Sequence, residues 1–578
     1  MSQNHSSSRE QGMEQYFFRA SATDFKKVQG SPIAYWMSAA QIKLFAGPKI
    51  AQYGRVGVGL QTGDNGKFIR YWFEVNQSNT ALEDDENDIS YTWYRCNKGG
   101  DYRKWFGNGL EVVLWKENGA ALKANTPSAV IRNESLYFLP CITWSRITSG
   151  SISFRYIPGG YIHNDASCFI VGNSPIENYN LLAYLNSPLR SIVLEGINPT
   201  LNLLPGQVNE TPYLAASFSG IENLIEFARD DWNAFETSWS FANSPITNQQ
   251  FQRPSLKTSY EKVRLHWREM TEEMQRLEEH NNRIFIDAYG LQDVLTPEVP
   301  LNEITLTCNP HYRYGGDKTE EELETLLLAD TMRELVSYAV GCMFGRYSLD
   351  KPGLILANQG ETLADYLAQV PQPRFPADDD NVIPLLDGDW FPDDITLRFR
   401  QFLRVAFGDA HYEDNLAFIE QALNAKGKRN FGLREYFLGE FYADHVKRYK
   451  KRPIYWLFSS PKGSFNALIY MHRYRPDTVS VVLKYLRDYR EKLSTEKERQ
   501  AAVSINPASS QGEKTKALKE VDRLAKVLTE LEDYERDTLY PLATEQVQID
   551  LDDGVKVNYL KFGAALKKIA GLEAKDED

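Results

Sequence analysis

The spacing of apolar residues changes near residue 250, and this change constrains the fold more than any other feature of the chain. From about residue 23 to that point, short aromatic and alternating runs are separated by turn signals. Beyond it apolar residues recur at helical spacing, beginning with a 4-3-4-3 series at Val263, Trp267, Met270, Met274 and Leu277. The sequence therefore predicts an α+β fold, in which a mixed α/β domain precedes a mainly α-helical C-terminal region with a helical hairpin.

Pattern and composition divide the 578 residues into five segments. A polar lead-in covers 1–22, and the mixed α/β domain covers 23–250. A connector helix at 251–300 leads to a helical domain with a basic stretch at 301–475. The C-terminal helical hairpin and a closing segment occupy 476–578.

Three local patterns give specific expectations. The Asn118–Gly119 pair lies between two short runs and predicts the turn of a β-hairpin. Residues 178–197 predict one helix, with Pro188 in an early turn or at a kink. Two amphipathic runs, 479–493 and 516–539, predict a pair of helices. Pro, Gly and Ser between these runs indicate a hairpin loop or a mobile connection.

The apolar series at 263–277 forms one narrow seam, which has two interpretations. The commoner arrangement is a connector helix that packs on its own domain. The alternative is coiled-coil pairing with a partner chain, because a sustained 3.5-residue repeat also suits that geometry.

Composition excludes several classes of protein. No apolar run approaches the roughly 20 residues that span a bilayer, and the polar N-terminus does not resemble a signal peptide, so we expect no membrane segment. The five cysteines include no CxxC pair, and the eight histidines show no HxxxH or HxH spacing. Isolated thiols suit the reducing cytoplasm, and we predict no metal site.

The net charge of −13 conceals one basic stretch. Residues 445–475 contain no Asp or Glu, and their cations are interleaved with Tyr and Trp. The cations are Lys447, Arg448, Lys450, Lys451, Arg452, Lys462, Arg473 and Arg475. Such a run is either a solvated surface or a contact for nucleic-acid phosphates.

A glycine-rich stretch at 54–75 raises the question of a cofactor loop. Gly57, Gly59 and Gly63 give a G-x-G-x-x-x-G spacing, but the turn signal DNGKF and a β-prone aromatic run follow where a dinucleotide site needs a helix. Two interpretations remain: a structural turn, or a turn that presents polar side chains to DNA. Gln and Asn can read adenine edges, and Lys can hold phosphate. The candidates are Gln61, Thr62, Asn65 and Lys67.

Catalytic motifs are absent. Asn309, Pro310, His311 and Tyr312 approach the Asn-Pro-Pro-Tyr motif of amino-methyltransferases, but His311 replaces the second proline, which favours a loop before the helix near 320. No nucleophile elbow, Walker loop or metalloprotease motif occurs. We predict no catalytic residues in this chain, so whether it acts alone as an enzyme is left open.

Several long stretches of the sequence together carry a resemblance to a known family. They are GSPIAYW (31–37), GLQTGDNGKFIRYWFEV (59–75), NKGGDYRKWFGN (97–108), TWSRITSGSISFR (143–155), LLAYLNS with NPTLN (181–202), CMFGRYSLDKPGLI (342–355), KRPIYWLFSSPKGSFNALIYMHRY (451–474) and DLDDGVKVNY (550–559). Through them nearly the whole chain resembles the C-terminal half of the PglX family, the adenine-specific DNA methyltransferases of BREX phage-defence systems. It is also similar to the recognition regions of type IIG restriction–modification enzymes.

The resemblance implies that 23–250 is a DNA target-recognition domain. In the family, a catalytic half that binds S-adenosylmethionine precedes this region; we expect that half to be absent here and to be supplied by another domain or chain. The expected partners are therefore double-stranded DNA, a methyltransferase catalytic domain and other BREX proteins, with no cofactor in this chain. The candidate DNA contacts are Gln61, Thr62, Asn65, Lys67, Lys98, Arg103, Lys104, Arg155, Lys447, Arg448, Lys450, Lys451, Arg452 and Lys462.

A protein of another class is also compatible with the sequence. The chain could be a protein-interaction scaffold of the defence complex, in which the seam at 263–277 and the hairpin at 479–539 bind partner proteins and DNA contact is secondary. The acidic net charge favours this alternative mildly.

Overall fold

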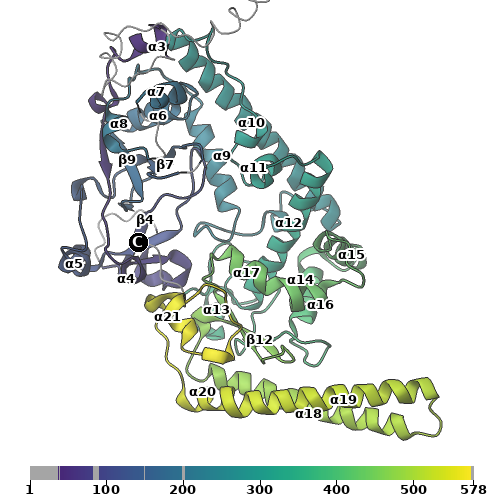
Figure 1. Cartoon of the computed structure of the whole chain (residues 1–578). Helices are drawn as coiled ribbons and strands as arrows, with labels where there is room; N and C mark the ends of the chain where they lie inside the picture. The colour runs from purple at the N-terminus through teal and green to yellow at the C-terminus, as the bar shows by residue number, and fades with distance from the viewer. Residues whose placement is uncertain (1–36, 38, 83–89, 149, 198–201, 574–578) are drawn as a thin grey trace, which may run out of the picture.

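The computed structural model describes residues 37, 39–82, 90–148, 150–197 and 202–573. Small sheets and short helices form the N-terminal part, and helices dominate the remainder (Figure 1). The predicted α+β fold is therefore confirmed. The polar lead-in expected at 1–22 lies outside the described residues.

Two sheets form the centre of the N-terminal part. The first has the order β1-β9-β6-β7 and is antiparallel throughout. The second has the order β2-β5-β4-β3, and β8 joins it by pairing in parallel with β4. The strands are β1 (Gly54–Val58), β2 (Ile69–Tyr71), β3 (Thr80–Ala81), β4 (Trp93–Asn97), β5 (Glu111–Leu114), β6 (Cys141–Ser145), β7 (Arg155–Ile157), β8 (Ile162–His163) and β9 (Ser167–Gly172).

Helices surround these sheets. Those of the N-terminal part are α3 (Ala39–Leu44), α4 (Asn65–Phe68), α5 (Lys116–Ala124), α6 (Pro175–Leu185), α7 (Leu189–Ile197), α8 (Pro205–Asn209) and α9 (Ile221–Asn233). Residues 178–197 form parts of two helices rather than one, and Pro188 lies directly before α7. The break has a physical reason, because proline lacks an N–H and disfavours helical geometry in the residue before it.

The β-hairpin predicted at Asn118–Gly119 is wrong. β5 leads into α5 through Glu117, Asn118 and Gly119, which all have positive φ angles. A Cβ atom at Gly119 would lie 2.6 Å from the Trp115 ring, so the indole packs directly on this backbone. Leu122 is buried in the same hydrophobic cluster as Trp115, and the burial of both side chains favours a helix here over a second strand.

The long helix α10 (Leu256–Tyr289) connects the two parts of the molecule and runs along one side of it (Figure 1). It begins at a capping box of Ser255 and Thr258 and ends at Gly290, whose φ is 64°. All five residues of the apolar seam are buried in the main core. The interpretation of the seam as a face packed on its own chain is therefore confirmed.

The helical body packs around a small antiparallel sheet of order β10-β12-β11. Its strands are β10 (Ile383–Pro384), β11 (Tyr455–Ser459) and β12 (Asn466–Tyr470). Its helices are α11 (Pro310–Tyr314), α12 (Glu320–Met343), α13 (Leu363–Gln369), α14 (Ile395–Phe407), α15 (Tyr412–Leu423), α16 (Leu433–Tyr436) and α17 (Tyr442–Arg448), with a π-helical turn, η7 (Phe437–Phe441), between the last two. Both long strands of this sheet are fully buried, so the sheet is the centre of the body.

The predicted helical pair is confirmed as α18 (Thr478–Ile505) and α19 (Gln511–Tyr534), which pack side by side and project from the body (Figure 1). A second π-helical turn, η9 (Glu535–Leu539), and α20 (Tyr540–Glu545) bring the chain back. The closing helix α21 (Gly554–Leu560) then lies beside the N-terminal sheets (Figure 1). The C-terminal segment therefore contacts both parts of the molecule.

Candidate nucleic-acid interface

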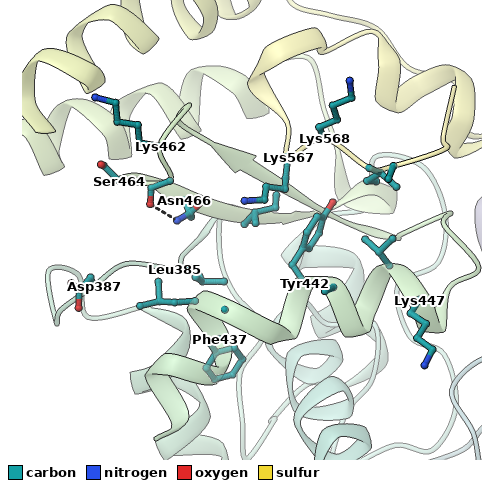
Figure 2. A pocket seen from close by; sticks show the side chains of 18 of the residues that line it. Leu385, Asp387, Phe437, Tyr442, Lys447, Lys462, Ser464, Asn466, Lys567 and Lys568 are labelled. Carbon is teal, nitrogen blue, oxygen red and sulfur yellow. Dashed lines mark hydrogen bonds between the residues drawn. The ribbon is translucent and has the colours of Figure 1, made fainter. Parts of the chain in front are cut away.

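A cleft of about 1190 Å³ lies beside the β11–β12 sheet. On one side are the turn between β11 and β12 and residues 567–570; on the other are η7 and α17 (Figure 2). The foot of the α18–α19 hairpin contributes Tyr489, Arg523 and Val527 to its wall. Segments more than a hundred residues apart in sequence therefore build one site.

Positive charge dominates this basic cleft. Its lining cations come from three separate segments, whereas Asp387 is the one carboxylate among the described residues that line it. The cations are Lys447, Lys450, Lys451, Lys462, Arg523, Lys567 and Lys568. A cleft lined by charges of one sign concentrates the electrostatic field, so this cleft can attract anions although the chain as a whole is acidic.

The floor of the basic cleft is apolar. Leu385, Trp390 and Phe437 line it together with Tyr442, whose hydroxyl shares a 2.8 Å hydrogen bond with the Tyr559 hydroxyl. The π-helical turn η7 supplies part of this floor. Such turns insert a residue into a helix and change the direction of the side chains, and they are frequent at functional sites.

Two lysines just after α17 have an unusual backbone conformation. Lys450 and Lys451 have φ angles of 52° and 62°, in the left-handed region. The Lys450 N–H donates to the Lys447 carbonyl at 3.1 Å, and the Lys451 N–H donates to the Val446 carbonyl at 2.8 Å. The reversal of the chain that these bonds close places Lys447, Lys450 and Lys451 on the same cleft.

A second cavity, of about 650 Å³, adjoins the first, because Tyr71 lines both. It unites Asn65, Lys98 and Arg452, three of the predicted contacts, which are far apart in sequence. Glu111 also lines it, and burial raises the pKa of this carboxyl to about 7, although Lys98 and Lys450 favour the charged form. We call this space the Asn65 cavity.

The glycine-rich stretch is built for close packing. A Cβ atom at Gly59 would lie 1.9 Å from the His163 carbonyl oxygen, so only glycine fits beside β8. The predicted turn at DNGKF is a single helical turn, α4, which Asp64 caps by accepting from the Lys67 N–H at 3.0 Å. β2 follows immediately.

The polar side chains of this stretch differ in exposure. Gln61 and Lys67 are exposed and Asn65 is half-buried, whereas Thr62 is buried and its hydroxyl donates to Asn65 Oδ1 at 2.8 Å. Gln61, Asn65 and Lys67 can therefore meet a ligand, and Thr62 positions Asn65.

Four of the predicted contact cations are engaged within the protein: Arg103, Lys104 and Arg155 are buried, and Arg448 is half-buried in an ion pair. Arg103 pairs with Asp231 on α9, Lys104 pairs with Glu278 on α10, and Arg448 pairs with Glu236 at 2.7 Å. Arg155 is buried next to Arg103, and burial lowers the pKa of its guanidinium to about 10. Contact with DNA would require the three buried groups to leave the core and Arg448 to break its ion pair with Glu236, so none of the four belongs to the proposed contact set.

The sequence did not indicate three of the cleft cations. Arg523 belongs to α19, and Lys567 and Lys568 belong to the closing segment. The adjacent pair of lysines was the available signal, but only the tertiary structure brings it to the basic stretch. Asn309, which resembled part of a methyltransferase motif, caps α11 by accepting from the His311 N–H at 3.2 Å.

Two classes of site are absent from the described part of the chain. No group of three or more His, Cys, Asp or Glu side chains there could hold a metal ion. No helix among the same residues has the length and apolar character that a membrane crossing requires.

The chain is similar to two methyltransferases along nearly its whole length. The adenine-specific methyltransferase BrxX of Escherichia coli O9:H4 (strain HS) is 36% identical over 571 residues, which are 95% of this chain and 46% of the relative. The adenine-specific methyltransferase PglX of Lacticaseibacillus casei (strain Zhang) is 34% identical over 582 residues, 96% of this chain and 46% of the relative. The chain thus spans about half the length of the curated relatives it matches. No protein-family model matches it.

Proposed function

We propose that this chain is the DNA-recognising part of a PglX-like N6-adenine DNA methyltransferase in BREX phage defence. Methyl transfer itself then takes place on a separate cytoplasmic catalytic domain that binds S-adenosylmethionine. The similarity to two adenine-specific methyltransferases supports the reaction class. The basic cleft is the observation that carries the DNA-binding role.

In the proposed mechanism, one set of residues positions the DNA duplex and another reads its base sequence. Lysines around the basic cleft hold backbone phosphates, which fixes the duplex without reading its sequence. Gln61 and Asn65 lie on the glycine-rich turn, and their amides can pair with base edges in the major groove. Lys67, Lys98 and Arg452 would hold phosphates between these two regions, because Lys98 and Arg452 line the adjoining Asn65 cavity.

Fluorescence anisotropy with a labelled duplex over a salt series tests this proposal. Lys567→Ala/Lys568→Ala removes two cations from the basic cleft. We expect weaker binding to all sequences alike and a salt slope reduced by about two. The matched control is Lys257→Ala/Lys262→Ala, which removes two exposed cations from α10.

Two results would contradict the proposal. One is wild-type protein that binds no duplex at low salt, alone or with a methyltransferase half added. The other is a cleft variant whose salt slope equals that of the α10 control.

One observation favours the scaffold role as a second candidate. The α18–α19 hairpin projects from the body, and two of its apolar side chains face solvent: Ile505 is 80% exposed and Leu518 is 54% exposed. A scaffold would keep its partner proteins when the cleft lysines are removed and lose them when Ile505 and Leu518 become Ser. A pull-down with the other BREX proteins distinguishes the two roles.

A further inference from the structure

The turn between β11 and β12 holds a carboxylate from a distant helix. Glu530 of α19 accepts hydrogen bonds from the Ser460 hydroxyl at 2.6 Å and from the Lys462 backbone N–H at 2.7 Å, both on Oε1. Its other oxygen accepts from the Ser464 hydroxyl at 2.5 Å. Glu530 is only 8% exposed, so these donors replace most of its hydration.

The turn is preorganised around this carboxylate. The Gly463 N–H donates to the Ser460 carbonyl at 2.8 Å, and the Phe465 N–H donates to the Ser460 hydroxyl oxygen at 3.1 Å. Pro461 and Gly463, the latter with φ of 73°, favour the tight reversal. These bonds hold Ser460 and the reversal of the chain independently of Glu530.

This donor set suits a phosphate group. Two hydroxyls and a backbone N–H in one turn form an anion-binding concavity, and Lys462 of the same turn contributes positive charge to this region. Lys462 and Gly463 line the basic cleft on one side and a cavity of about 600 Å³ on the other, and Lys567 and Lys568 line both spaces as well. Figure 2 shows Lys462 and Ser464 on the turn, with Lys567 beside the same sheet.

Glu530 remains charged in this position. Burial by itself raises the pKa of the carboxyl, but the hydrogen bonds from Ser460, Ser464 and Lys462 outweigh burial and lower it. An incoming phosphate would therefore compete with a resident anion for the same donors.

We propose that the turn Ser460–Ser464 is a phosphate-binding site, which Glu530 occupies as an internal substitute until a backbone phosphate of nucleic acid displaces it. The displacement removes the contact between Glu530 and the turn, so binding loosens the attachment of the α18–α19 hairpin to the body. That the phosphate belongs to nucleic acid rests on the proposed function. That the turn binds a phosphate group rests only on its hydrogen-bond donors.

A purely structural role for Glu530 predicts the opposite result. If the carboxylate only ties α19 to the sheet, its removal weakens the fold and leaves anion affinity unchanged or lower. If Glu530 competes with phosphate, its removal exposes the donors and raises anion affinity.

The first experiment measures duplex affinity by anisotropy. We expect Glu530→Ala to bind about tenfold more tightly, because charge-assisted hydrogen bonds become available to a phosphate, with a salt slope steeper by about one. Asp522→Ala removes an exposed carboxylate from the same helix and controls for general electrostatics. Ser460→Ala/Ser464→Ala should cancel the gain. Equal affinities for Glu530→Ala and Asp522→Ala would overturn the proposal.

The second experiment uses sodium pyrophosphate and amide hydrogen exchange. We expect pyrophosphate to slow exchange in residues 460–465 of Glu530→Ala, and to have no such effect when Ser460 and Ser464 are also replaced. Glu530→Gln, which keeps the side-chain volume, replaces Glu530→Ala if the alanine variant does not fold. Protection without duplex binding would refute the DNA-binding function and leave the phosphate site intact. No protection in either variant refutes the site.

Discussion

At the residue scale, neighbouring cations end in opposite environments. Lys98 lines the Asn65 cavity, whereas Arg103 and Lys104 are buried in ion pairs. Their partners, Asp231 and Glu278, lie 128 and 174 residues away in sequence. A buried charge must be paired, but the sequence does not reveal a partner at that separation. The residue types therefore predicted which cations could contact DNA, but they did not show which of these cations are buried and which lie at the surface.

Glu111 gives a prediction for pH dependence. Burial raises the pKa of its carboxyl from 4.5 to about 7 in the folded protein, so the native state binds more protons than the unfolded state between these values. The contribution of Glu111 to the free energy of unfolding is therefore fully present below about pH 4.5 and is lost as pH rises to about 7. Between pH 4.5 and about 7, we expect the free energy of unfolding to fall less in Glu111→Gln than in the wild type.

Urea unfolding at several pH values measures the effect of Glu111→Gln. Glu117→Gln, at an exposed position just after the same strand, is the control. Parallel pH profiles for wild type and Glu111→Gln would show that Glu111 does not titrate as expected.

At the element scale, local signals were reliable where the sequence contains both the periodicity and the caps. The seam of α10 follows one face of the helix, and Ser255 and Gly290 mark its ends. The Asn118–Gly119 pair was misleading because the positive φ angles that favour a hairpin turn can also precede a helix. Burial of Trp115 and Leu122 decided between these outcomes, and burial is a tertiary property.

At Lys450, just after α17, we expect one substitution to stabilise the fold and to weaken duplex binding. Lys450 has φ of 52°, a conformation that costs a non-glycine residue about 1 kcal/mol. Lys450→Gly should therefore raise the free energy of unfolding by about 1 kcal/mol while it weakens duplex binding, because a cleft cation is lost. Lys450→Ala loses the same charge without gaining the freedom of glycine. Equal stability of the two variants would argue against strain at this position.

At the scale of the whole molecule, the C-terminal segment joins the two parts. The Trp93 indole N–H donates to Asp552 Oδ1 at 2.9 Å, and the Val555 N–H donates to Glu74 Oε2 at 2.8 Å. The same segment packs on the helical body through Tyr559 and Phe562, which lie against Trp456. The Asn65 cavity lies at this junction, so its shape depends on residues near both ends of the described chain.

Asp552→Ala tests this junction. The substitution leaves a buried indole N–H without its acceptor, so we expect a loss of about 1–2 kcal/mol in the free energy of unfolding. Amide exchange should accelerate in β4 and α21 and stay unchanged in the distal hairpin. Asp553→Ala, at the adjacent exposed position, should have little effect. Unchanged exchange in β4 would mean that this bond does not hold the segment in place.

The sequence by itself determined the α+β class, the long connector helix, the helical pair and the basic stretch at 445–475. Apolar periodicity and helix caps act over a few residues, so one chain is enough to read them. Only the tertiary structure decided which cations meet. It brought Lys567 and Lys568 to the same cleft as Lys447 and placed Glu530 in the β11–β12 turn, because the burial of distant apolar segments fixes where their charged neighbours lie.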